Sequence, residues 1–446
     1  MLLYFCIQNC ELLFIKRFLY RVSILLKDGM TARLDWIEMK FLITNDGNFR
    51  NKGNEAIAKS IVNGISSITA DASFEIFTND PVYARYVTEN KKVSFLTQPF
   101  RIWHPFTRWW HYIIISKLGF SASVKRAMDA FRNADVVLST AGDNFSSTSS
   151  NLHMHIGFIK TAVAFKKPVF LIGCSVDPFT NKRKYKSFCE AARNIRLVTA
   201  RESISFKYLQ SMNLGDARIE LAADPAFCLE PNMEKIQKIL GAYHISDEKP
   251  IVGIAPSQAI TYYTKLPYVA HFKVLQNLIE FLMKELRYHV VLIPHVREVS
   301  VKGNDDVICE KLYRNLNFPK DMSIISLDHS AEEIRALMSK LDLLVAERMH
   351  AAIAGLAQQV PTFVIGYSIK AEGILGDIFG FENLMDYMVP INKLNEETLE
   401  TCVKNLIDKK DEVNKYLSKR IRHIKNSAKD NFVLIMDILR SGNIED

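Results

Sequence analysis

The sequence contains no long uninterrupted apolar run. Residues 1–26 are rich in Leu and Phe, but four charged side chains interrupt them, namely Glu11, Lys16, Arg17 and Arg21. A membrane-spanning helix needs roughly 18–20 consecutive apolar residues, and the basic–apolar–small order of a signal peptide is also missing. Residues 1–38 are therefore interpreted either as an amphipathic helix on a membrane surface or as an extension outside the folded unit. Both interpretations stay open here.

Cysteine is scarce, and its spacing fits neither a disulfide framework nor a metal site. The chain has seven cysteines, an odd number, and the closest pair, Cys6 and Cys10, has no second pair to complete a set of ligands. This usage indicates a reducing compartment and predicts no metal site.

Dense basic blocks and low-complexity segments are also absent. The net charge is +8, but Lys and Arg are scattered along the chain. This distribution suits an anionic small molecule or an anionic membrane surface, and it argues against a nucleic-acid partner. The chain has 446 residues, of which 48% are hydrophobic and 24% charged. These values are typical of a soluble globular protein with two or three domains.

Short apolar strands alternate with helical stretches from residue 39 onward, which predicts an α/β fold. The first series of predicted strands is KFLITN, ASFEIFT, VSFLT, ADVVLST, KPVFLIG and IRLVTA; the second is IVGIAPS, YHVVLIPH, SIISLD, LDLLVAE and PTFVIG. The charged stretch 231–250, which contains two prolines, separates the two series. We therefore expect two Rossmann-like doubly wound domains facing a cleft in a GT-B-like arrangement, at residues 39–235 and 236–395, followed by a helical segment at 396–446. Ligands of such folds bind beyond the carboxyl ends of the strands.

One of these strand ends carries an unusual group of side chains. After the apolar run LDLLV, the segment AERMHAAIAGLAQQ places Glu347, Arg348 and His350 at a predicted strand-to-helix turn. The free N–H groups and the dipole of a helix start bind anions, and Arg348 adds a planar cation suited to phosphate or carboxylate. The helix dipole disfavours protonated His350 unless an anion is bound. The alternative is an Arg–Glu pair and a histidine that simply fill a polar turn.

The second half of the chain resembles the polysaccharide pyruvyl transferase family. That family carries an Arg-x-His on a strand-to-helix turn, then a helix of small residues, Val-Pro and another strand. The matching positions are Arg348, His350, Val360 and Pro361, with GYSIKAEGIL (366–375) as the continuation, and upstream His295 in LIPHV and Asn304 and Asp305 in GNDD.

The first half agrees with this resemblance, which runs from about residue 40 to residue 385. The matching positions are Asn51, Gly53, Glu55, Ala56 and Ile57; Gly173, Ser175, Pro178 and Phe179; and Arg201, Ser203, Ser205, Asp224 and Pro225. Three positions depart from the family pattern: Asn54 stands where an acidic residue is common, Asp177 replaces a glycine, and Asp143 adds a negative charge to STAGDNFS. These departures fall in the half expected to hold the acceptor, so they bear on acceptor identity.

The resemblance implies transfer of an enolpyruvyl unit from phosphoenolpyruvate to a sugar of a surface or exopolysaccharide precursor, ending as a cyclic ketal. This reaction needs a positioned acid and base, but neither a metal nor an organic cofactor. His350 is the first choice for that role and His295 the second, with Arg348 as the third catalytic residue. The predicted substrate-binding residues are Arg201, Lys370, Asn51, Gly53, Asn54, Glu55, Asp143, Ser175, Asn304 and Asp305. Glu55 and Asp143 are candidates to orient or deprotonate the sugar hydroxyl, although each could equally be a loop cap or a surface charge.

The stretch RIWHPFTRWWHYIIISK (101–117) holds three of the four tryptophans. It is either a helical core face or a sugar-stacking or membrane-interface patch. The second interpretation would suit a lipid-linked oligosaccharide acceptor and a cytoplasmic protein that contacts the inner membrane face. Two other functions stay open: a GT-B-type glycosyltransferase that uses a nucleotide sugar, and a noncatalytic glycan-binding module. The two glutamates typical of retaining glycosyltransferases are not both present, since Gly355 stands where Glu347 would need its partner.

Overall fold

The computed structural model describes residues 38–44, 47–99, 122–146, 149, 151–246, 248–264, 266–298 and 301–442. The N-terminal segment 1–37, the tryptophan-rich stretch 101–117, Cys6 and Cys10 lie outside the described residues, so the predictions made for them remain predictions. Residues 39–446 form one compact unit.

The first lobe is built on a seven-stranded parallel sheet with the order β3-β2-β1-β4-β5-β6-β7. All residues of β5 are buried, as expected for a parallel sheet covered on both faces. The strands are β1 (Met39–Thr44), β2 (Ala72–Thr78), β3 (Val93–Thr97), β4 (Val136–Gly142), β5 (Val169–Cys174), β6 (Leu197–Ala200) and β7 (Arg218–Leu221). The helices are α2 (Lys52–Ile68), α3 (Pro81–Tyr86), α5 (Ala122–Asn133), α6 (Leu152–Ala164), α7 (Lys182–Ala192) and α8 (Ser203–Gln210).

The second lobe is built on a six-stranded parallel sheet with the order β10-β9-β8-β11-β12-β13. Its strands are β8 (Ile251–Ala255), β9 (His289–Leu292), β10 (Met322–Ile324), β11 (Leu343–Ala346), β12 (Thr362–Gly366) and β13 (Met388–Pro390). Its helices are α10 (Ile260–Tyr263), α11 (Tyr268–Lys284), η4 (Val301–Gly303), α12 (Asp305–Asn315), α13 (Ala331–Met338), α14 (Met349–Ala357), α15 (Ile369–Phe379), η5 (Phe381–Asp386), η6 (Ile391–Lys393) and α16 (Glu396–Asp408).

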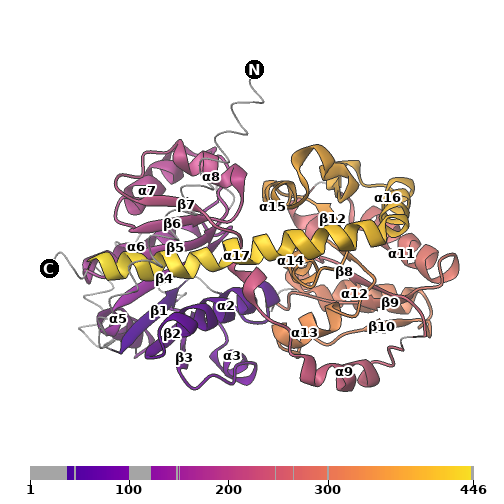
Figure 1. The fold of residues 1–446 in the computed structure, drawn as a ribbon, viewed down its shortest axis with the longest axis horizontal. Coiled ribbons are helices and arrows are strands. Elements are labelled where there is room, and N and C mark those ends of the chain that lie inside the picture. Colours follow the sequence, from indigo (N-terminus) through magenta and orange to yellow (C-terminus); the bar gives the residue numbers. More distant parts are fainter. Residues whose placement is uncertain are drawn as a thin grey trace. The chain divides into compact units, whose positions relative to one another are not determined.

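Three short elements connect the sheets, and one long helix returns across both. The connecting elements are η2 (Pro225–Cys228), η3 (Met233–Lys235) and α9 (Ile236–Ala242). Helix α17 (Lys410–Gly442) contacts α2 and β5 in the first lobe and α14, α15 and α16 in the second (Figure 1). Asn431 of α17 accepts a hydrogen bond from Thr199 Oγ1 and donates one to the carbonyl of Ala223, which fixes the helix to the first lobe.

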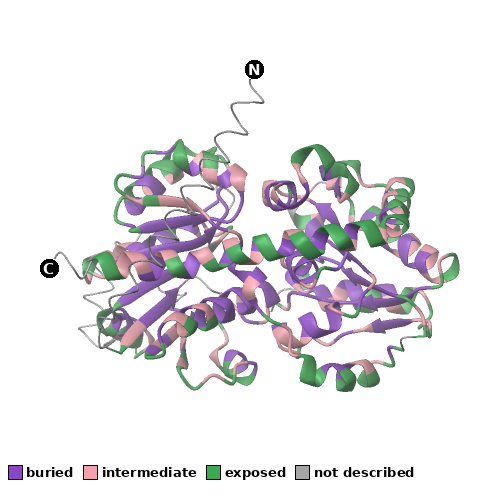
Figure 2. Ribbon diagram, viewed as in Figure 1, coloured by how far each residue is buried: buried purple, intermediate pink, exposed green. Residues whose placement is uncertain are grey.

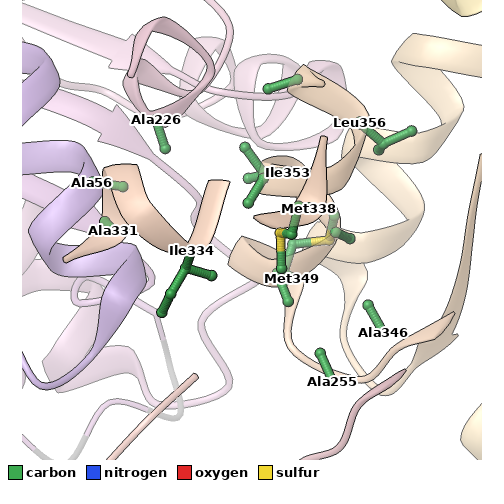
Figure 3. Packing of buried hydrophobic residues seen from close by; sticks show 14 of the residues in the cluster. Ala56, Ala226, Ala255, Ala331, Ile334, Met338, Ala346, Met349, Ile353 and Leu356 are labelled. Carbon is green, nitrogen blue, oxygen red and sulfur yellow. The ribbon is translucent and has the colours of Figure 1, made fainter. Parts of the chain in front are cut away.

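The buried apolar residues form a core that is continuous between the lobes. One cluster joins Ala56 of α2 and Ala226 of η2 to Ile334 of α13 and Ile353 of α14 (Figure 3). The strands of both sheets are buried along most of their length, whereas the outer helix faces are exposed (Figure 2). The lobes therefore share an apolar interface as well as two connections.

Local sequence signals explain where the central helices begin. Asn51 caps α2 by accepting a hydrogen bond from Gly53 N, and Thr69 ends that helix in an extended conformation. Ser330 and Glu333 form a capping box at the start of α13, in which each side chain accepts from the backbone N–H of the other residue. These caps fix the register of two helices that meet at the lobe interface.

The predicted fold class is confirmed, because every predicted strand is present and two parallel sheets form two Rossmann-like lobes. Strands β7 and β13 were not predicted. Both are edge strands, and β7 (sequence RIEL) is only partly buried, so neither has the apolar run of a central strand. The boundaries at residues 235 and 395 remain our proposal for the division of the chain. Within the described residues, no helix combines the length and apolar character that crossing a bilayer requires.

The strand order reverses at one place in each sheet. In the first sheet this happens between β1 and β4, and in the second between β8 and β11. Ligands of open α/β sheets bind at such switch points, beyond the carboxyl ends of the strands. The segment that follows β11 carries Arg348 and His350, at the switch point of the second sheet.

Candidate functional site

The start of α14 lies directly beyond the end of β11. Glu347 is buried below it, and its carboxylate accepts a hydrogen bond from Ser257 N at 2.6 Å and lies 2.6 Å from His271 Nε2. Arg348 is the N-cap residue and makes no side-chain capping bond. The small residues of α14 allow it to lie close to the sheet, since a Cβ at Gly355 would come within 2.5 Å of Leu344. The first N–H groups of α14 therefore have no intrahelical acceptor and no capping side chain.

Arg348 is held by a carboxylate from the neighbouring helix. Its Nε donates to one oxygen of Asp305 at 3.1 Å, and its Nη2 donates to the other at 2.7 Å. Asp305 is fully buried and also accepts from the backbone N–H groups of Gln258, His295 and Val296. This bidentate pair fixes the plane of the guanidinium, of which 15% of the side-chain surface is exposed.

His350 meets the first lobe through Arg201 and Asp224. Its Nε2 lies 3.4 Å from Arg201 Nη1 and 3.7 Å from Asp224 Oδ2. Arg201 is buried, and it donates to Asp224 at 2.8 Å and to Ser175 Oγ at 2.7 Å. Burial alone would raise the pKa of Asp224, but the neighbouring His350 and the Arg201 charge outweigh it and hold that pKa well below its usual range. Asp224 is thus an ionised group placed behind the imidazole.

Gly53 of α2 packs against the His350 ring. A Cβ at Gly53 would lie only 2.7 Å from His350 Cβ and nearer still to the ring atoms Cγ and Nδ1. Gly53 was predicted to bind substrate. Its observed contact is with His350, and this contact requires a residue without a side chain.

His295 lies beneath the two basic residues. It is buried, its carbonyl accepts from Lys52 N at 3.0 Å, and its Nδ1 has no hydrogen-bond partner among the described residues. Burial, together with the nearby charges of His350, Arg348 and Lys52, lowers the pKa of His295 to about 3. His295 is therefore neutral near pH 7 in this state, which does not suit a general acid.

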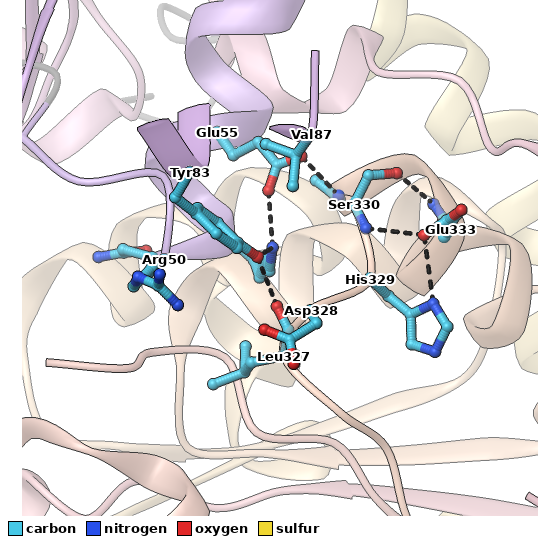
Figure 4. A network of polar contacts seen from close by, with 12 residues as sticks. Arg50, Glu55, Tyr83, Val87, Leu327, Asp328, His329, Ser330 and Glu333 are labelled. Carbon is cyan, nitrogen blue, oxygen red and sulfur yellow. Dashed lines mark hydrogen bonds and ion pairs between the residues drawn. The ribbon is translucent and has the colours of Figure 1, made fainter. Parts of the chain in front are cut away.

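Glu55 lies in a buried network between the lobes (Figure 4). One carboxylate oxygen accepts from Lys52 Nζ at 2.8 Å, and the other accepts from Lys59 Nζ at 2.8 Å and Ala331 N at 2.9 Å. Lys59 also donates to Glu332 of the second lobe at 2.6 Å. The carboxylate is fully buried and its oxygens are occupied, so the geometry does not favour the predicted contact with a sugar hydroxyl.

Asp143 and Lys370 join the lobes on the side of β4. Lys370 Nζ donates to Asp143 Oδ2 at 2.5 Å. The positive charge of Lys370 lowers the pKa of Asp143, and 60% of the Asp143 side chain is exposed. Asp143 is therefore an accessible, ionised carboxylate whose partner comes from the opposite lobe.

Two of the predicted asparagines cap helices, and a third lies in the first turn of one. Asn51 caps α2 and also forms an isolated antiparallel bridge with Val296 of the second lobe. Asn304 caps α12 by accepting from Asp306 N at 3.1 Å. Asn54 is partly exposed in the first turn of α2. Of the predicted residues, the structure therefore groups Arg348, His350, His295, Arg201, Ser175, Asp305 and Gly53, and leaves Asn54 and Glu55 outside this group.

Two residues after β8 were missed by the sequence analysis. Ser257 Oγ and Gln258 Oε1 are buried and have no hydrogen-bond partner among the described residues. Their backbone N–H groups donate to Glu347 and Asp305, so both belong to the same group of residues. The available signal was their position, because polar residues that directly follow a buried strand at a switch point are candidate ligands.

The sequence between residues 51 and 369 matches the profile of a family described as polysaccharide pyruvyl transferase. The chain belongs to the polysaccharide pyruvyl transferase family. It is therefore a transferase that acts on polysaccharide, and the resemblance seen in its motifs is confirmed. The curated relatives include the amylovoran biosynthesis protein AmsJ of Erwinia amylovora, which is 20% identical over 408 residues, covering 86% of this chain and 95% of AmsJ.

Solved structures show the same two-lobed fold. The UDP-GlcNAc 2-epimerase of Neisseria meningitidis bound to UDP-GlcNAc has a TM-score of 0.60 and 12% identity, covering 91% of this pyruvyl transferase and 100% of the epimerase. The wall teichoic acid polymerase TagF has a TM-score of 0.53 and 12% identity, covering 92% of this chain and 90% of TagF. At these identities the likeness shows the fold alone and carries no information on the chemistry.

Proposed function

We propose that this protein transfers a pyruvyl group from phosphoenolpyruvate to two hydroxyls of one sugar, forming a ketal. The observation that carries the proposal is the meeting of Arg201 and Asp224 from the first lobe with His350 at the start of α14, beside the Arg348–Asp305 pair. A histidine beside the Arg201 guanidinium, in the first turn of a helix whose N-cap residue is Arg348, suits a small polyanion and acid–base chemistry on it.

The donor is proposed to bind at the start of α14. Arg201 and Arg348 each already carry a carboxylate partner, so they supply orientation more than surplus charge. The N–H groups of Met349 and His350, together with buried Ser257 Oγ, supply further hydrogen bonds for the phosphate and carboxylate of phosphoenolpyruvate. A bound polyanion would also raise the pKa of His295, because its negative charge opposes the effect of the cationic neighbours of that imidazole.

The protons of the reaction balance without another reactant. The sugar supplies two hydroxyl protons. One is delivered to the methylene carbon of the donor, whose C=C double bond becomes single, and the other leaves with inorganic phosphate. Two C–O bonds form at the central carbon, and its bond to the phosphate oxygen breaks. His350 is our candidate to deliver the first proton, because its Nε2 lies 3.7 Å from the ionised carboxylate of Asp224. Asp143 replaces Glu55 in our proposal as the carboxylate for the sugar hydroxyl, since it is exposed while Glu55 is buried.

A cytoplasmic location and a lipid-linked acceptor at the inner membrane face remain part of the proposal. The described cysteines, Cys174, Cys189, Cys228, Cys309 and Cys402, are all free thiols, which suits a reducing compartment. AmsJ, by its name, acts in amylovoran biosynthesis. We propose by analogy that the acceptor here is a precursor of a surface or exopolysaccharide.

The test is a phosphate-release assay with purified protein, phosphoenolpyruvate and a panel of free and lipid-linked glycans. Release that requires both the donor and one acceptor is the expected result. Turnover of a nucleotide sugar in place of phosphoenolpyruvate would instead support the glycosyltransferase alternative and overturn the proposal.

The His350→Ala variant then tests the assigned role. We expect it to lower kcat while leaving donor binding, measured by calorimetry, within a few fold of the unchanged protein. His423→Ala, an exposed histidine on α17, is the control. Equal losses in binding and in kcat would contradict a role for His350 in proton transfer.

A further inference from the structure

A pocket with a volume of about 430 Å³ lies between the lobes, away from the start of α14. Lys59 and Asn63 of α2 and the segment around Tyr86 line its first-lobe side, and residues 328–333 line its second-lobe side. This volume falls in the range of small-molecule sites, about 300–1,000 Å³. Neither the motifs of the sequence nor the proposed donor site accounts for it.

The pocket is separate from the donor site. Gly53 contacts His350, whereas Lys59 and Asn63 lie six and ten residues further along α2, or about 9 and 15 Å at 1.5 Å per residue. Glu55 lies between Gly53 and Lys59 along the helix, and its buried network (Figure 4) continues through Lys52 to Tyr83, whose Oη donates to the carbonyl of Leu327 at 2.6 Å. A ligand in the pocket would therefore not displace phosphoenolpyruvate.

The acidic residues of the pocket are mostly neutralised by cations. Glu332 pairs with Lys59 at 2.6 Å, Glu333 with Lys235 at 2.9 Å, and Asp328 with Arg297 at 2.9 Å. In the described part of the chain, no cluster of three or more His, Cys, Asp or Glu side chains is arranged to hold a metal ion. The pocket therefore presents neither a metal site nor an excess of positive charge for an anion.

What remains in the pocket is hydrogen-bonding capacity, from two amides and the exposed carboxylate of Glu89, beside an exposed aromatic ring. The side chains of Asn63 and Asn232 make no hydrogen bond to other described residues, and each amide can both donate and accept. Tyr86, 72% exposed, supplies the accessible ring at the pocket edge, whereas Phe49 and Phe95 are buried beneath the lining. The amides and the Tyr86 ring match the hydroxyl edges and a C–H face of a sugar.

We infer that this pocket binds a neutral saccharide, as a second glycan site separate from the site of chemistry. The inference rests on membership of a family that acts on polysaccharide and does not depend on the identity of the donor. A polymeric acceptor presents several sugar residues, and a remote pocket would hold one that is not being modified.

Saturation-transfer difference NMR on the full chain tests this inference, with maltose, cellobiose, lactose and diacetylchitobiose as probes. We expect at least one probe to bind at millimolar concentration. Asn63→Trp fills the pocket from an exposed helix position and should weaken that binding by about tenfold or more. Tyr86→Ala removes the exposed ring at the edge and should weaken it as well. Asn194→Trp, at an exposed asparagine of the same lobe outside the pocket, is the matched control and should bind as the unchanged protein does.

The outcomes separate the second site from the proposed reaction. Loss of saccharide binding in Asn63→Trp with unchanged phosphoenolpyruvate binding would support the inference. Absence of binding by every probe, or equal binding by Asn63→Trp and the unchanged protein, would overturn it. Loss of both ligands in Asn63→Trp, but not in Asn194→Trp, would also overturn it, because the sites would then not be separate.

Discussion

Replacing Gly53 with alanine should disable His350 without unfolding the protein. The new Cβ would lie 2.7 Å from His350 Cβ, whereas an ordinary contact begins near 3.4 Å, so His350 must move by at least 0.7 Å and its ring by more. The 3.4 Å and 3.7 Å distances from Nε2 to Arg201 and Asp224 would then change. A misplacement of about 1 Å at a reacting group can cost about 10²-fold in rate, so we expect kcat to fall by roughly that factor.

The stability of this variant should fall by no more than about 3 kcal/mol. Alanine favours a helix by up to about 1 kcal/mol over glycine, and this gain opposes the cost of overpacking, about 1–3 kcal/mol, because His350 Cβ can move only with its backbone. Acceptor-dependent phosphate release gives kcat, urea unfolding gives stability, and histidine side-chain NMR reports the environment of the ring. Gly241→Ala is the control, because a Cβ there meets no atom within 4 Å. Full kcat together with an unshifted His350 resonance in Gly53→Ala would refute the reasoning.

Three further predictions follow from the described contacts. Arg348→Lys should lower kcat/KM for phosphoenolpyruvate about 100-fold, since an ammonium cannot make both hydrogen bonds to Asp305. A change in kcat/KM below threefold, measured by steady-state kinetics, would contradict this prediction. Lowering the pH from 7 to 5 should destabilise the wild type by about 2 kcal/mol more than it destabilises His295→Asn. Between the histidine pKa of the unfolded chain, near 6.5, and the folded pKa of His295, about 3, only the unfolded chain takes up a proton at this position, so acid favours unfolding. Urea unfolding at both pH values measures the difference, and exposed His423→Asn should show no such difference from the wild type. Lys59→Met should cost about 3–5 kcal/mol of unfolding free energy, because it leaves the buried Glu55 carboxylate without one of its partners. Lys186→Met, at an exposed ion pair, should cost less than about 0.5 kcal/mol. Equal losses in the two variants would reject the argument.

The fold was predictable because its signals are local. Central parallel strands are continuous apolar runs, as in β5 and β8, and the polar turns between them mark the alternation of strands and helices. The edge strands β7 and β13 lack that signal, since their short sequences gain strand structure from one neighbour only. Their positions follow from the completed sheets, which no local pattern encodes.

The site was predictable in its residues but not in its pairings. Arg348 and His350 were located because they follow a buried strand and begin a helix. Their partners lie far along the chain: Asp305 is 43 residues from Arg348, and Arg201 is 149 residues from His350. Glu55 was assigned to the substrate because it matches the family's motif at the start of the first helix. Only the packing of two lobes shows that this one is buried and bonded to Lys59 and Ala331 N.

The geometry around His350 depends on contacts that lie well away from it. Arg201 and Asp224 belong to the first lobe, and His350 belongs to the second, so their distances are set by how the lobes pack. The carboxylate of Glu55 receives bonds from both lobes, through Lys59 and Ala331 N, and removing a partner from a buried charge costs about 3–5 kcal/mol. A separation of the lobes would break these bonds together with the apolar contacts of Figure 3. The same helix α2 that carries Glu55 and Lys59 also places Gly53 against the imidazole, so the lobe interface positions the histidine before any substrate arrives.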